Sequence, residues 1–115
     1  MVINFDFARN LILKISSYEG FDALTDEDLL NENTPIAKVQ AYLDLFIEEE
    51  LISAKVKTWL DGSKTYEIRY VTLKGKHFSD SLKNPNFWQK YKKKITQKGI
   101  NFFTDFVEKI ILAKL

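Results

Sequence analysis

Apolar and polar residues alternate along two neighbouring stretches, residues 52–59 and 65–70, with an Asp-Gly pair between them at 61–62. A period of two is typical of strands with one buried face, and Asp-Gly is typical of a hairpin turn. A two-residue loop would place apolar side chains opposite polar ones, so we predict a three-residue loop, Leu60-Asp61-Gly62, with Gly62 in the left-handed conformation. This register pairs Ala54 with Ile68, Lys55 with Glu67 and Val56 with Tyr66.

Helical spacing dominates the residues before this hairpin. A first helix begins at Asn4 or Asp6 and ends at Gly20, with apolar positions at Phe7, Leu11, Ile12, Ile15 and Tyr18. Thr25 and Asp28 match a variant of the capping box and predict a short second helix. Thr34-Pro35 then opens a third helix, with a hydroxyl cap and proline at its first position.

The two faces of the third helix differ in character. The predicted core face carries Ile36, Val39, Leu43, Phe46 and Ile47. The predicted exposed face carries Thr34, Ala37, Lys38, Ala41, Leu45 and Glu48. Lys38 is the only cation on that exposed face.

Three further helices are predicted after the hairpin. Thr72 caps one that runs to about Lys83, where Asn84-Pro85 breaks it, and residues 86–98 form the next. The last, Ile100 to Lys114, is apolar around much of its circumference. We therefore predict a homodimer through Phe102, Phe103, Phe106 and Ile110. The alternative is that this helix folds back onto the first helix of the same chain.

The order of these elements predicts an α+β fold: a winged helix-turn-helix with a two-stranded wing and additional C-terminal helices. We expect a single domain over residues 1–115, with a winged-helix core over 1–83 and a C-terminal helical extension over 84–115. Val71-Thr72-Leu73-Lys74-Gly75 is similar to the Leu-Thr-x-x-Gly that follows the wing in many winged-helix regulators.

A longer pattern is more specific: Gly75-x-x-Phe78-x-Asp80-x-Leu82-Lys83-Asn84-Pro85-x-x-Trp88-x-x-x-Lys92. It resembles a family of small uncharacterised proteins, a domain of unknown function, from Gram-positive bacteria and their phages. This chain departs from the family where His usually follows the glycine, because Lys76 stands there and His77 comes one residue later. The resemblance implies a winged-helix fold and a bacterial or phage origin, without an activity.

Composition narrows the location and the chemistry. The chain has no cysteine and no export signal at its start, so we expect a cytoplasmic protein without disulfides. Residues 100–115 are too short and too charged to span a bilayer. The chain has a single histidine, no cysteine, no Gly-rich phosphate loop and no metal-ligand spacing, which argues against an enzyme and against any cofactor or metal. Asp26-Glu27-Asp28 fits the acidic start of a helix better than a metal site.

Charge is unevenly distributed although the net charge is +1. Residues 1–51 hold three Lys/Arg against eleven Asp/Glu, whereas residues 71–115 hold ten against three.

The winged-helix pattern predicts a DNA-binding protein, a bacterial or phage transcriptional regulator. Its predicted DNA contacts are Thr34, Lys38, Lys55, Lys57, Lys64 and Arg69.

The acidic first half supports another class of function. Asp44 and Glu48 to Glu50 follow Thr34 and Lys38, the predicted DNA contacts of the third helix. Their negative charges would repel the phosphates of DNA. The alternative is therefore a protein-interaction module, a phage or prophage accessory protein that modulates a host protein without binding DNA. A continuous positive stripe from Lys38 to the wing would favour DNA, and its absence would favour a protein partner.

Overall fold

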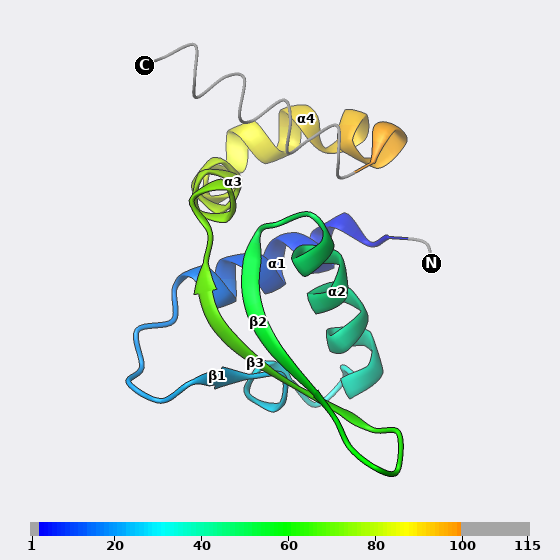
Figure 1. Cartoon of the computed structure of the whole chain (residues 1–115). Helices are drawn as coiled ribbons and strands as arrows, with labels where there is room; N and C mark the ends of the chain where they lie inside the picture. The colour runs from blue at the N-terminus through cyan, green and yellow to red at the C-terminus, as the bar shows by residue number, and fades with distance from the viewer. Residues whose placement is uncertain (1–2, 100–115) are drawn as a thin grey trace.

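A computed structural model describes residues 3–99 and shows an α+β fold (Figure 1). The helices are α1 (Phe5–Ser16), the 3-10 helix η1 (Glu27–Leu29), α2 (Ile36–Glu48), α3 (Leu73–Lys83) and α4 (Pro85–Lys98). The strands β1 (Leu24–Thr25), β2 (Ile52–Thr58) and β3 (Lys64–Val71) form an antiparallel sheet in the order β1-β3-β2. This arrangement is compatible with the predicted winged helix, and the β2–β3 hairpin, called the wing below, extends away from the helices.

The predicted register of the wing is confirmed. Ala54 pairs with Ile68, Lys55 with Glu67 and Val56 with Tyr66. The loop is Leu60-Asp61-Gly62, because Trp59 N–H still donates to Ser63 O across the hairpin, and Gly62 has the positive φ of 88° that such a loop requires. The register shifts between Ser53 and Ala54, where Arg69 is the extra residue of a β-bulge.

The segment between α1 and α2 differs from the expectation. The α1 helix starts at the predicted Asn4 cap, whose side chain accepts from Phe7 N–H, but it ends at Ser16 and not at Gly20. The capping-box bonds between Thr25 and Asp28 form, yet the helix they precede is a single 3-10 turn. Thr25 itself belongs to β1. This strand has only two residues, too few for an alternation of apolar and polar positions to predict it.

The start of α2 also differs from the prediction. Pro35 is the N-cap residue and no side chain caps the helix; the Thr34 hydroxyl instead donates to Asn31 Oδ1 at 2.7 Å. The predicted hydroxyl cap was wrong, because Thr34 belongs to the preceding turn. Buried residues on α2 are Val39, Tyr42, Leu43 and Phe46. Ile36 is exposed and Leu45 packs partly against the core, so both assignments at the edges of the apolar face were wrong.

The residues of the long motif after the wing serve the fold. Thr72 caps α3 by accepting from Gly75 N–H, as predicted, and Phe78 and Leu82 are buried. Asn84 Oδ1 accepts from the N–H groups of Asn86 and Phe87 at the start of α4. These contacts explain much of the motif without an activity.

Side-chain contacts join α1 to α3 and α4. Trp88 is buried, and its indole N–H donates to Asp6 Oδ1 at 3.1 Å. Lys92 Nζ lies 2.6 Å from Asp6 Oδ2, and Arg9 donates to Leu82 O while its guanidinium lies over the Trp88 ring. The predicted helix over residues 100–114, with Phe102, Phe103, Phe106 and Ile110, lies outside the described residues.

Candidate nucleic-acid interface

The outer face of the wing is exposed and carries cations. Lys55 and Lys57 pair across the hairpin with Glu67 and Thr65, so these four residues share the face opposite to the one on which Tyr66 and Ile68 are buried. All four are exposed. The result is a charged strip on a strand pair that extends beyond the helical body (Figure 1).

An aromatic residue lies at the tip of this strip. Lys57 Nζ is 3.9 Å from the centroid of the Trp59 ring, a cation–π contact, and Trp59 Nε1 donates to Thr65 Oγ1 at 3.3 Å. Trp59 remains about half exposed, at 47%. Asp61 is the acid of the turn; its carboxylate accepts from the Ser63 hydroxyl and N–H, which lowers its pKa. The tip therefore combines an aromatic surface with both signs of charge.

The other two wing cations are placed differently. Lys64 pairs with Thr58 and, by the alternation of the strand, belongs to the face of Tyr66 rather than that of Lys55. Its backbone carbonyl accepts from Gln40 Nε2 of α2 at 2.9 Å. Arg69 is the exposed bulge residue at the opposite end of β3. The wing thus brings Lys55 and Lys57 together and leaves Lys64 and Arg69 apart from them.

Lys38 lies on the side of α2 that faces α1. Its Nζ is 4.3 Å from the centroid of the Phe7 ring, and Phe7 contacts Tyr42 edge-on. Gln40 is about 200° further around the helix at 3.6 residues per turn. Since Gln40 contacts β3, Lys38 and the wing lie on opposite sides of α2. The structure therefore does not join Lys38 to Lys55 and Lys57 in one stripe.

Polar contacts fix the side of α2 that meets the sheet. The buried Asp26 carboxylate accepts from Gln40 Nε2 at 2.8 Å and from Glu27 N–H at 3.0 Å. The Tyr66 hydroxyl donates to Asp44 Oδ1 at 2.7 Å. Burial and this hydrogen bond raise the pKa of Tyr66, so the hydroxyl stays protonated as a donor. Sequence reasoning missed this network, because residues 14 to 22 positions apart meet only in the fold.

The acidic cluster at residues 26–28 has split roles. Asp26 is buried against α2, whereas Asp28 is exposed and accepts from the Thr25 N–H and hydroxyl, which lowers its pKa. All three acids nevertheless stand at the start of a helix, as predicted, because Asp26 is the N-cap residue of η1 and Glu27 and Asp28 lie in its first turn.

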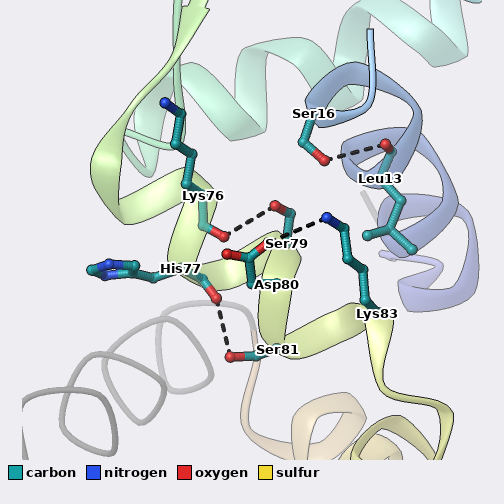
Figure 2. Close-up of polar contacts among 8 residues, drawn as sticks. All are labelled: Leu13, Ser16, Lys76, His77, Ser79, Asp80, Ser81 and Lys83. Carbon is teal, nitrogen blue, oxygen red and sulfur yellow. Dashed lines mark hydrogen bonds and ion pairs between the residues drawn. The ribbon is translucent and has the colours of Figure 1, made fainter.

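Figure 2 shows the surroundings of His77 on α3. Its imidazole points away from Asp80 and Lys83, which form an ion pair at 3.3 Å. The hydrogen bonds drawn on the helix run from the Ser79 and Ser81 hydroxyls to the carbonyls of Lys76 and His77. These are backbone contacts of helical serines, and they do not activate a nucleophile.

Within residues 3–99, no helix is long and apolar enough to cross a membrane. No curated protein and no solved structure matches the chain. One family model does, over residues 3–101, and it is described as a hypothetical protein family, DUF2513. That span includes the wing, α2 and the whole Gly75 to Lys92 motif, so the resemblance suspected from the motif is confirmed, and the chain belongs to the DUF2513 family, a domain of unknown function.

Proposed function

We propose that this protein binds duplex DNA mainly through the outer face of its wing, as a regulator of bacterial or phage transcription. The observation that carries the proposal is the exposed pair Lys55 and Lys57 on a projecting hairpin with Trp59 at its tip. Lysines on such a hairpin suit phosphate contacts, which give affinity without base specificity.

Under this proposal, α2 would make few sequence-specific contacts with the bases. Its exposed charged residues are Lys38, Asp44 and Glu48, and the Lys38 ammonium lies over Phe7. The helix has no arginine and no asparagine, and the amide of Gln40, which could contact adenine in the same way, is bonded to Asp26 and to Lys64 O. We expect weak sequence discrimination and a strong dependence on salt.

A salt series on a labelled duplex tests the proposal. Lys55→Gln/Lys57→Gln should weaken binding and reduce the log-log salt slope by about two units, roughly 0.9 for each phosphate that is no longer neutralised. Glu67→Gln removes the acid from the same face and should tighten binding. A matched variant, Lys83→Gln/Lys94→Gln, removes the same charge from α3 and α4 and should leave the slope unchanged. Equal losses of affinity in the two double variants would overturn the role of the wing.

A second candidate function is a protein-interaction module that uses α2. The observation that favours it is the separation of Lys38 from the wing, which leaves α2 without a positive stripe toward the hairpin. The exposed surface of the helix also includes apolar Ile36 and Ala37 in its first turn, and acidic Asp44 and Glu48 in its second half. Such a surface suits a basic protein partner better than phosphate. Loss of a co-purified partner on Ile36→Asp, with duplex affinity unchanged, would support this candidate.

A further inference from the structure

A groove of about 740 Å³ borders β3 on the side away from the wing tip. It lies between the last residues of β3 and the loop that joins α1 to β1. Its lining includes the buried apolar residues Ile15, Leu24 and Ile68, and the partly exposed rings of Tyr18 and Tyr70. A groove of this size can accommodate a ligand or a short segment of chain.

The groove exists because β1 stops early. Leu24 pairs with Ile68 and Thr25 with Glu67, but the residues before Leu24 turn away from the sheet and do not continue along β3. The Tyr18 hydroxyl donates to Asp22 O at 2.6 Å, and this bond holds the loop away from the edge of β3. The edge of β3 beyond Ile68 therefore has no neighbouring strand within residues 3–99.

Backbone groups of Val71 face this open edge. Thr72 N–H donates to Leu51 O, on the side of β2. Since adjacent strand residues direct their N–H and C=O groups to opposite sides, those of Val71 point away from β2 and toward the groove. An added strand could pair with them where β1 leaves off.

Two cations stand beside the same edge. Arg69 and Lys76 are exposed, line the groove and form no ion pair with any residue that the structure describes. The acids of the lining are placed elsewhere: Glu67 lies where β1 already pairs, and Asp22 lies in the facing loop. The unpaired stretch is therefore bordered by positive charge on the side of β3 and α3.

We infer that this edge of β3 binds an extended acidic peptide segment of a partner protein, which adds a strand to the sheet at Val71. Main-chain hydrogen bonds would supply affinity, the apolar floor would accept alternate apolar side chains, and Arg69 and Lys76 would bind the acidic ones. This site is separate from Lys55 and Lys57, so it does not depend on DNA binding.

An array of immobilised hexapeptides provides the probe, with acidic residues alternating with Val, Ile or Tyr, beside a matched array with Lys in place of the acids. The acidic peptides should bind the wild-type chain at least tenfold more tightly than the Arg69→Glu/Lys76→Glu variant. Lys83→Glu/Lys94→Glu, with the same charge change on α3 and α4, should bind like wild type. If no acidic hexapeptide prefers the wild-type chain to the Arg69/Lys76 variant, the inference is wrong.

Two further measurements distinguish strand addition from simple charge attraction. Methylation of alternate backbone nitrogens in the best hexapeptide should reduce its affinity at least tenfold, because those groups can no longer pair. Amide exchange at Val71 should slow on binding of the unmethylated peptide. Unchanged affinity after methylation, or unchanged exchange at Val71, would overturn strand addition. Tyr70→Ala, which changes no charge, should weaken the same peptide and guards against misfolding of the charge-reversed variant.

Discussion

The Tyr66 hydroxyl donates a 2.7 Å hydrogen bond to the Asp44 carboxylate and so joins the wing strand β3 to α2. Tyr66 is buried, at 2% exposed, whereas Asp44 is exposed and can be hydrated when the tyrosine hydroxyl is removed. Tyr66→Phe should therefore lower the free energy of unfolding by only about 0.5–1.5 kcal/mol, the net value of one hydrogen bond. Urea denaturation measures this, with Tyr70→Phe on the exposed part of β3 as the control that should change nothing.

The Asp26–Gln40 pair should matter more, because its carboxylate is buried. Gln40→Ala removes a donor from Asp26 and from the contact to Lys64 O, and should cost about 1–3 kcal/mol. A double-mutant cycle with Asp26→Asn should show a coupling of about 0.5–3 kcal/mol. Additive effects would mean that the two side chains act independently.

Glu50 offers a stabilising substitution. It follows α2 with φ +61°, while Leu51 N–H donates to Phe46 O and Glu50 N–H to Ile47 O, which is the Schellman arrangement that glycine prefers. Glycine adopts the left-handed conformation without the steric cost that Glu50 bears there. This gain is larger than the additional conformational entropy that glycine loses on folding, so Glu50→Gly should raise the free energy of unfolding by about 0.5–1 kcal/mol. The matched Glu49→Gly change removes the same charge at φ −82° and should lower stability in the same thermal melts.

Gly75 tolerates no side chain, because a Cβ there would collide with the Leu51 carbonyl oxygen of the backbone. Gly75→Ala should lower the free energy of unfolding by about 2–4 kcal/mol. In an ordinary helix the same substitution raises the free energy of unfolding by roughly 1 kcal/mol. Gly62→Ala at the wing loop meets no atom and strains only φ, so it should cost about 1–2 kcal/mol. Chemical denaturation that ranks Gly62→Ala as the more harmful change would contradict the close approach of Gly75 to the Leu51 carbonyl.

The Asp6–Lys92 contact predicts a pH dependence. The Lys92 ammonium lowers the pKa of Asp6 below its usual value of 3.8, aided by the Trp88 indole. The contribution of this pair is therefore fully present above about pH 5 and disappears as the pH falls through the lowered pKa of Asp6. Because both side chains are about half exposed, we expect about 0.2–1 kcal/mol.

Stability curves of the wild-type chain and of Asp6→Asn, measured from pH 2 to pH 7, test this dependence. The difference should be constant at neutral pH and vanish at the acidic end. A difference that persists at pH 2 would show that the ion pair is not its source.

The wing could be predicted in detail because its constraints are local. One face of β2 and β3 is apolar, so only one loop length keeps Val56 and Tyr66 on the same side. The caps Asn4 and Thr72 were predicted for the same reason, since each contact spans three residues.

What sequence reasoning missed depends on distant residues. The pattern predicts a free Lys38 on an exposed face, but its position over Phe7 follows from the packing of α2 on α1. Tyr42 was not assigned to the core, although its hydroxyl accepts from Asn4 N–H at 2.7 Å and its ring contacts Phe7. The Thr34 cap was wrong because α2 begins at Ile36, one residue later than Thr34-Pro35 predicts.

The contact of Asp6 with Lys92 has a consequence for how the chain acquires its fold. The two residues are 86 positions apart, so closing this loop costs more entropy than closing the hairpin, whose strands are joined by a three-residue loop. During synthesis, α1 leaves the ribosome long before its partners on α3 and α4 exist. The wing can therefore form early, whereas the contact of Asp6 must wait until residue 92 has emerged.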